Sequence, residues 1–215
     1  VLNSIPSSIN KINVTMGFPL SETPLYDLIK IILKVKKNSF VRNYQKSSYY
    51  KDIIELISHP YVYQYDKDFS NSFIEELNSK KLIYIPHSYF DSKSSLLNII
   101  FNSSNNILNN LSDVIELFYK KIENFGNLDK EYLIYFHKLF DRLLEIDFDI
   151  ESVEVLSKLL SQISRITKIP FSGEPLSGLQ VMGVLESRNL DFDQVFILSV
   201  NEGELPRKSL NNSFI

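Results

Sequence analysis

Cysteine is absent from all 215 residues, which excludes disulfide bonds and any metal site or cluster held by thiolates. A chain without cysteine is compatible with a reducing compartment, and we expect a cytoplasmic protein. No apolar run reaches the length of a membrane-spanning helix, so no membrane partner is expected. An excess of positive charge is also missing, because the net charge is -3. Domains that bind DNA tightly without specificity are usually basic, so this balance argues against that class but leaves room for a local basic patch.

Two kinds of catalytic signature are missing as well. No Gly-x-x-x-x-Gly-Lys-Ser/Thr segment occurs, so the chain cannot bind ATP through a P-loop. The three histidines, His59, His87 and His137, share no metal-ligand spacing. We interpret His59, which precedes Pro60, as a helix-end residue, and His137 as a residue beside an apolar helix face. We therefore predict no catalytic residue and no metal site within this chain.

The composition that is present supports a folded core. Hydrophobic residues make up 44% of the chain and charged residues 23%, values typical of globular domains. The length suits one large domain or two small ones. Because the chain begins without Met and ends without a terminating pattern, we expect it to be a piece of a longer protein.

The N-terminal segment predicts a strand followed by a helix. Residues 12–16 alternate between apolar and polar, as a short strand does. Thr23 followed by Pro24 is typical of a helix start, and the apolar residues after them recur at helical spacing. That predicted face consists of Leu25, Leu28, Ile29, Ile32 and Leu33. A basic run of Lys34, Lys36, Lys37 and Arg42 follows, and we favour a solvated helix end over a phosphate contact.

The middle of the chain predicts a helical bundle. Shorter helices are expected near residues 50–57, 69–79 and 96–101, and residues 81–86 suit either a short strand or an extended link. Three longer amphipathic segments follow at helical spacing. Their apolar faces are Ile107, Leu108, Leu111, Val114, Ile115 and Phe118, then Tyr132, Leu133, Phe136, Leu139, Phe140, Leu143 and Leu144, then Val153, Leu156, Leu159, Leu160, Ile163 and Ile166. Short links near Gly126 and residues 147–149 favour antiparallel neighbours. Since most aromatic residues lie at helical spacing, we interpret them as core rather than as base-stacking platforms.

After Pro170 the pattern returns to strands. Residues 179–185 predict a strand, and the continuous apolar run at residues 195–198 is typical of a buried parallel strand. We therefore predict an α/β fold interrupted by a mostly helical insertion. The expected division is residues 1–37, a helical insertion over 38–167, and residues 168–215, with the first and last segments forming one α/β unit.

Residues 178–206 resemble motif V of the UvrD/RecB helicase superfamily, in which a strand, a Lys-Gly-Leu-Glu-Phe turn, a hydrophobic strand and a Glu-Gly-x-x-Pro turn follow one another. Residues 12–20 resemble the start of the second RecA-like domain in the AddB-like branch. The motif positions in this chain are Gly183, Leu185, Asn189, Asp191, Phe192, Glu202 and Gly203. The resemblance implies a partial RecA-like (P-loop NTPase-like) domain in an AddB/RecB-like helicase–exonuclease subunit, whose parent also carries a PD-(D/E)XK nuclease. ATP and Mg²⁺ for that parent, DNA, and a second helicase–nuclease subunit are implied with it.

This chain departs from the motif at the positions that contact ligands. The usual Thr and His are Gly183 and Leu185 here, and the usual Lys-Gly is Arg188-Asn189. Such changes fit an AddB-like subunit whose helicase core is degenerate. Ligands bind at the strand ends of open α/β sheets, so we assign DNA contacts to Arg188, Arg207 and Lys208. For Arg188, a DNA or inter-domain role and a structural salt bridge are equal alternatives.

Two alternatives stay open. Asp91-Ser92-Lys93, with Asp66 or Asp68 before it, matches part of a PD-(D/E)XK nuclease site. We favour a polar helix start there, because such triplets arise often by chance and the family's nuclease domain lies further along the chain. For function, we expect a fragment of an ATP-dependent DNA helicase/exonuclease subunit for double-strand break repair and recombination, itself inactive, that guides DNA and docks other subunits. The alternative is a non-enzymatic scaffold that binds a protein partner.

Overall fold

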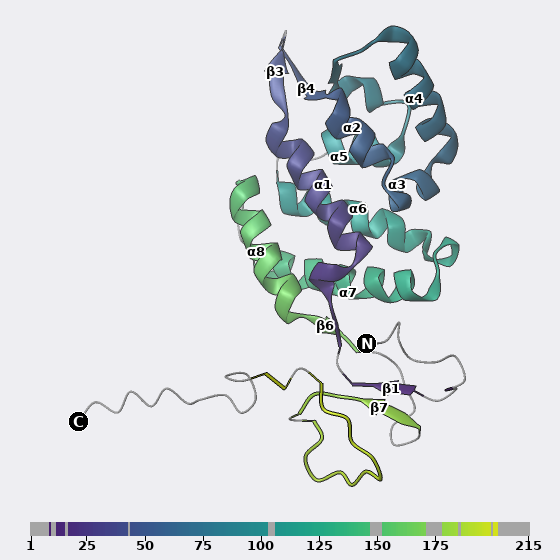
Figure 1. Ribbon diagram of the computed structural model, residues 1–215. Coiled ribbons are helices and arrows are strands. Elements are labelled where there is room, and N and C mark those ends of the chain that lie inside the picture. Colours follow the sequence, from purple (N-terminus) through teal and green to yellow (C-terminus); the bar gives the residue numbers. More distant parts are fainter. Residues whose placement is uncertain are drawn as a thin grey trace, which may run out of the picture.

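The chain folds into a mixed α/β structure in which helices predominate (Figure 1). The computed structural model describes residues 9, 12–15, 17–42, 44–102, 106–146, 152–170, 178–184, 186–198 and 200–201. The α-helices are α1 (Pro24–Asn38), α2 (Tyr50–Ile57), α3 (Pro60–Tyr65), α4 (Lys67–Lys80), α5 (Ser95–Asn102), α6 (Ile107–Lys120), α7 (Asn127–Glu145) and α8 (Val153–Ile166). Short 3-10 turns are η2 (Leu20–Glu22), η3 (His87–Phe90) and η4 (Ile122–Asn124). Among the described helices, none is long and apolar enough to span a bilayer.

Three small sheets join segments that are close or distant in the sequence. The strands are β1 (Ile12–Val14), β2 (Phe18–Pro19), β3 (Phe40–Arg42), β4 (Gln45–Tyr49), β5 (Tyr84–Pro86), β6 (Lys168–Ile169) and β7 (Leu179–Val181). Strand β1 pairs in parallel with β7, and β2 pairs antiparallel with β6. Strands β3, β4 and β5 form an antiparallel sheet in that order. The first two pairs bring the predicted N-terminal and C-terminal segments together, at the end of the molecule opposite the β3–β4 hairpin (Figure 1).

Helix α1 begins as the sequence predicts. The Thr23 hydroxyl accepts a hydrogen bond from the Tyr26 amide at 3.2 Å, and Pro24 occupies the first turn, where its missing N–H is not needed. Every residue of the predicted apolar face is buried. The helix packs against α2, α7 and α8, so the predicted division at residue 37 falls at the end of a helix that shares the core of the helical middle.

The three long amphipathic segments form α6, α7 and α8, as predicted. Helices α6 and α7 pack against each other across the link that contains η4 and Gly126 (Figure 1). Most residues of the predicted faces are buried or partly buried in one continuous core. Ile166 is the exception, because it is the last residue of α8 and remains 79% exposed. We call α1 to α8 the helical body.

The β3–β4 hairpin was not predicted from the sequence. Its second strand, Gln45–Tyr49, has no alternation of apolar and polar residues, so the usual signal for a strand is missing. Instead, Ser47 and Ser48 are the buried residues of this strand. The third strand, β5, confirms the strand interpretation of the segment that follows α4.

The predicted buried strand at residues 195–198 is wrong. These residues have no regular secondary structure, and the side chains of Val195, Phe196, Ile197 and Leu198 are 60 to 82% exposed. A buried parallel strand needs a neighbouring strand for its backbone and cover on both faces. In the part of the chain that the structure describes, neither lies beside this segment. The strand predicted over 179–185 is also shorter, since β7 ends at Val181.

Candidate functional site

The parallel pair of β1 and β7 places two strand ends at one edge. The register aligns Asn13 with Gln180, and these side chains form a hydrogen bond of 2.7 Å. Beyond the strands, the Thr15 amide donates to the Val181 carbonyl at 3.0 Å, so the pairing extends one step further. The carboxyl ends of parallel strands are the usual location of ligand sites in α/β folds. We call this edge and the turn that follows it, residues 182–190, the parallel edge.

Glu186 joins the two halves of the parallel edge. Its carboxylate accepts one hydrogen bond from the Gly183 amide at 3.2 Å and a close one from the Thr15 hydroxyl. The hydrogen bond from Thr15, then that from Gly183 and the attraction of Lys168 hold the pKa of Glu186 below its usual range, against a smaller opposing effect of burial. The carboxylate is therefore charged at neutral pH and engaged in structure, which leaves it unsuited to act as a general acid.

A compact turn presents Arg188. The Glu186 amide donates to the Gly183 carbonyl at 3.0 Å, and the Ser187 hydroxyl donates to the Val184 carbonyl at 2.8 Å. Asn189 then adopts the left-handed conformation, with φ of 60°. Among residues other than glycine, asparagine is one of the few that tolerate this region, so Asn189 keeps a backbone shape that glycine would also adopt. Arg188 is exposed, and no described acidic residue pairs with it.

The other predicted site residues divide into two groups. Gly183, Asp191 and Phe192 lie in or beside the turn with Arg188 and Asn189, and Phe192 is partly exposed. The remaining predicted positions, Leu185, Glu202, Gly203, Arg207 and Lys208, lie outside the described residues. Sequence reasoning did not single out Thr15 or Glu186. Their hydrogen bond spans 171 positions, and no local pattern signals such a contact.

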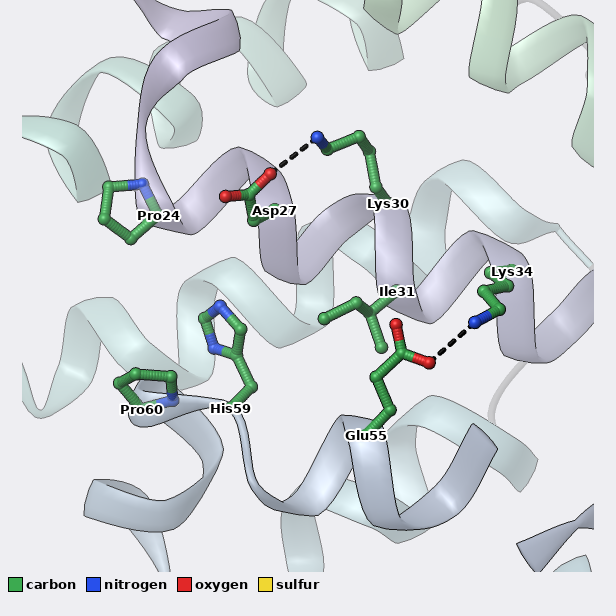
Figure 2. Close-up of a pocket in the computed structure, with 8 residues that line it drawn as sticks. All are labelled: Pro24, Asp27, Lys30, Ile31, Lys34, Glu55, His59 and Pro60. Carbon is green, nitrogen blue, oxygen red and sulfur yellow. Dashed lines mark hydrogen bonds and ion pairs between the residues drawn. The ribbon is translucent and has the colours of Figure 1, made fainter. Parts of the chain in front are cut away.

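The charged side chains that line a hollow beside His59 form ion pairs with one another. Its wall carries the ion pairs Lys30–Asp27 at 2.5 Å and Lys34–Glu55 at 2.6 Å (Figure 2). His59 accepts from the Tyr61 amide at 3.3 Å and caps α3, which confirms its predicted role at a helix end. Burial lowers the pKa of His59, although nearby Asp27 acts in the opposite direction. The hollow thus contains a structural histidine rather than an activated one.

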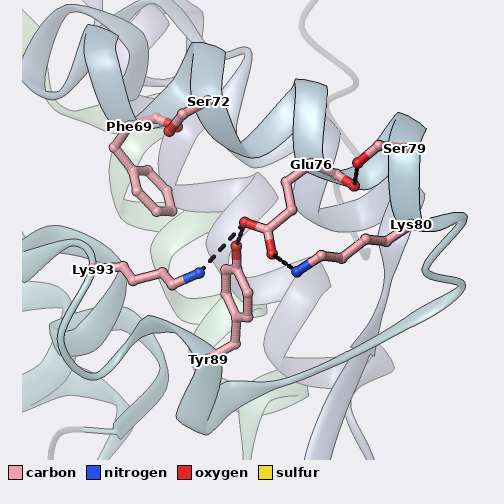
Figure 3. Close-up of polar contacts among 7 residues, drawn as sticks. All are labelled: Phe69, Ser72, Glu76, Ser79, Lys80, Tyr89 and Lys93. Carbon is pink, nitrogen blue, oxygen red and sulfur yellow. Dashed lines mark hydrogen bonds and ion pairs between the residues drawn. The ribbon is translucent and has the colours of Figure 1, made fainter.

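Lys93 of the suggested nuclease triplet takes a structural role. Lys93 lies 3.7 Å from the centre of the Tyr89 ring and 3.4 Å from Glu76 (Figure 3). Glu76 also accepts from Lys80 at 2.7 Å and from the Tyr89 hydroxyl, and these bonds lower its pKa to about 2. Asp66 caps α4 by accepting from the Phe69 amide. Within the described ranges, no three His, Cys, Asp or Glu side chains come together as metal ligands.

A buried Ser–His contact lies where β4 meets the helical body. The Ser48 hydroxyl is 2.9 Å from His87 Nε2, and the Ser39 hydroxyl is 3.0 Å from that of Ser48. Burial, followed by the positive charges of Lys46 and Lys36, lowers the pKa of His87 to about 4. A serine beside a neutral histidine is the arrangement of a nucleophile and its base. However, Ser48 is fully buried, so a substrate cannot reach it, and the pair serves to satisfy buried polar groups.

Comparisons of the chain with known protein families, with curated proteins and with solved structures found no match in any of the three. The parallel edge, with its exposed arginine beside two strand ends, is therefore the feature on which a functional proposal rests.

Proposed function

We propose that this chain is part of an AddB/RecB-like helicase–exonuclease subunit, in which it guides DNA and docks other subunits during double-strand break repair and recombination. In this proposal the paired β1 and β7 segments belong to a partial RecA-like domain, and the helical body is its insertion. The parent protein acts in the cytoplasm, uses ATP and Mg²⁺, and works with a second helicase–nuclease subunit.

The single observation that carries the proposal is the exposure of Arg188 at the parallel edge. Arginine is suited to phosphate because its guanidinium group is always charged and donates several hydrogen bonds in one plane. Ion pairing would compete with this role, but among the described residues Arg188 has no acidic partner. The Asn189 backbone, with φ of 60°, turns the chain just after Arg188. The salt-bridge alternative therefore has no support within the described part of the chain.

The parallel edge does not fit ATP. A phosphate group would need backbone N–H donors such as that of Gly183, but Glu186 already accepts from this N–H. Together with the missing P-loop, this contact argues against ATP binding at the parallel edge, and no step of ATP hydrolysis is assigned to it.

The test is the salt dependence of binding to a blunt duplex DNA, compared between the wild type and Arg188→Ala. Each lost phosphate contact lowers the slope of log affinity against log salt by about 0.9 for duplex DNA. We expect weak binding with two or three such contacts, and a slope that falls by about one contact in Arg188→Ala. Arg142→Ala, at an exposed arginine of α7, is the matched control and should leave the slope unchanged.

Fluorescence anisotropy between 50 and 200 mM salt measures both variants. An unchanged slope in Arg188→Ala contradicts the assignment of this residue to DNA. Absence of binding by the wild type at the lowest salt favours the alternative function, a scaffold for a protein partner. The exposed apolar side chains at residues 195–198 are the observation that supports this alternative, since contiguous exposed apolar groups mark interaction sites.

A further inference from the structure

The antiparallel sheet at the other end of the molecule carries aromatic side chains on its outer face. The register pairs Phe40 with Ser47 and Tyr49 with Tyr84, which places Phe40, Arg42, Tyr49 and Tyr84 on the same side. Ring contacts agree, because Phe40 and Tyr84 are 5.2 Å apart and Tyr49 and Tyr84 are 6.1 Å apart. The opposite side buries Ser48 and Ile85 against the helical body. We call these four outer residues, together with Tyr44, the aromatic sheet face.

Arg42 adds a cation to this face. Its guanidinium carbon lies 4.9 Å from the centre of the Tyr84 ring, a cation–π contact. Phe40 and Tyr84 are 36% and 41% exposed, so the rings are accessible although they touch one another. Both arginine planes and aromatic rings are surfaces on which unpaired nucleobases stack.

The hairpin tip places one more ring in solvent at an unfavourable backbone position. Two residues separate the paired Arg42 and Gln45, and the second of them is Tyr44. Tyr44 has φ of 62° and is fully exposed. Tight hairpins favour glycine at this position, and a bulky residue there is strained. A strained and fully exposed aromatic residue has no role in stability that the described contacts explain, which points to a role in binding.

The positive charge of the segments around this sheet indicates a negatively charged partner. The segments that hold the three strands, residues 39–51 and 80–90, contain five Lys or Arg residues and no Asp or Glu, although the whole chain has a net charge of -3. These cations are Arg42, Lys46, Lys51, Lys80 and Lys81. Lys80 pairs with Glu76, whereas the other four are exposed and form no ion pair with a described residue. The sheet and its flanking segments therefore combine unneutralised cations with exposed rings, with Arg42 on the aromatic sheet face and Lys46 on the opposite side of the sheet.

We propose that the aromatic sheet face binds single-stranded nucleic acid, with bases stacked on Tyr44, Phe40 and the Arg42–Tyr84 pair and phosphates near the surrounding lysines. A duplex stacks its base faces inside the helix, where rings on a protein surface cannot reach them, so the rings give a preference for single strands. The site lies at the opposite end of the molecule from the parallel edge (Figure 1) and does not depend on the function proposed for that edge.

The experiment measures binding of the full chain to fluorescein-labelled oligo(dT), oligo(U) and a duplex of equal length. Tyr44→Gly should weaken single-strand binding about tenfold, the effect of losing one stacked base. The same change should not lower the midpoint of thermal unfolding, because glycine adopts positive φ without strain. Arg42→Ala should also weaken single-strand binding, because it removes the guanidinium plane beside the Tyr84 ring from the stacking surface.

Matched controls lie on the helical body. Tyr119→Ala removes a ring that is 40% exposed on α6, and Arg142→Ala removes an exposed arginine of α7. Both should bind single strands as the wild type does. Binding of oligo(dT) alone assigns DNA, binding of oligo(U) alone assigns RNA, and equal binding assigns the stacking chemistry they share. The proposal is overturned if neither single strand binds at 50 mM salt, if Tyr44→Gly leaves binding unchanged, or if the controls weaken it equally; a protein partner then becomes the occupant to seek.

Discussion

Apolar side chains are buried in the helical body but exposed along residues 190–200. In the helical body, the largest side chains, such as Phe73, Phe118 and Phe136, are almost completely buried. Along residues 190–200, by contrast, Leu190, Phe192, Val195, Phe196 and their apolar neighbours are exposed. The two regions have similar apolar residues, so composition does not explain the difference.

The difference follows from where each kind of element finds its hydrogen bonds. A helix satisfies its backbone within itself, and an apolar stripe then needs only a neighbouring helix, which short links supply. A strand must find another strand before its backbone is satisfied, and its partner is often distant in the sequence. Strand β7 has such a partner in β1, whereas residues 195–198 have none among the described residues. Burial of these apolar side chains therefore depends on pairing.

The largest expected effect comes from replacing one phenylalanine by alanine in each of the two regions. Phe118 packs edge-on against Tyr61, Tyr65 and Phe125, and it is fully buried. Phe118→Ala should lower the free energy of unfolding by about 3 to 5 kcal/mol, because it removes a large ring and leaves a cavity. Phe196 is 82% exposed, so Phe196→Ala should change it by less than about 0.5 kcal/mol.

Urea denaturation followed by circular dichroism measures both variants against the wild type. A loss of several kcal/mol in Phe196→Ala, of the size expected for Phe118→Ala, would break the comparison, because it would mean that residues 195–198 are packed in solution. A small effect in Phe118→Ala would contradict the packing of the helical body instead.

The next prediction concerns pH and tests whether the three-stranded sheet belongs to the ordered core. The pKa of His87 falls from 6.5 to about 4 in the fold, chiefly because of burial. Below pH 6.5 the unfolded chain therefore binds a proton that the folded chain does not, so the stability of the folded chain decreases as the pH falls from about 6.5 to about 4. Between pH 6.5 and pH 5 the loss should be about 1.5 kcal/mol.

His87→Gln should remove this part of the pH dependence, although it also lowers stability at neutral pH by disturbing the contacts with Ser48 and Phe101. The control is His137→Gln, at a partly exposed histidine that lies 2.8 Å from Asp141 on α7. This control should retain the loss of stability that is attributed to His87. If the profiles of the wild type and His87→Gln run parallel from pH 7 to pH 5, His87 is accessible to water and the sheet is loosely attached.

The sequence predicted the helical body well because its signals are local. The cap at Thr23 and the apolar stripes of α6, α7 and α8 need only a few consecutive residues to be recognised, and the structure confirms them. The β3–β4 hairpin escaped prediction because its buried positions are Ser47 and Ser48, which no hydrophobic pattern marks. The run at 195–198 led to the opposite error, since apolar character predicts burial only where a pairing partner exists.

The candidate sites divide in the same way. Strand periodicity and the family resemblance pointed to Gly183, Arg188 and Asn189, and the structure gathers these residues in one turn. The hydrogen bond between Thr15 and Glu186 joins residues that are 171 positions apart, so only the three-dimensional structure could reveal it. The aromatic sheet face was interpreted as core, because the exposure of Tyr44 and Tyr84 follows from a hairpin that the sequence did not predict.

The smallest expected effect belongs to Glu186, and it tests whether the parallel edge is ordered independently of the helical body. Glu186→Gln keeps an oxygen that can accept from Thr15 and Gly183 but removes the charge that strengthens these bonds. We expect faster amide hydrogen exchange in peptides that cover residues 178–190, and unchanged exchange in the helical body. Because the pKa of Glu186 lies below its usual value in the fold, the wild type should keep its protection above pH 4.5 and approach the variant as the pH falls below that value.

Glu116→Gln, which breaks an exposed pair with Lys120 on α6, is the matched control and should leave residues 178–190 unchanged. Faster exchange throughout the helical body of Glu186→Gln would show that the two regions unfold as one cooperative unit. Equal exchange in the wild type and both variants would show that Glu186 does not stabilise the parallel edge.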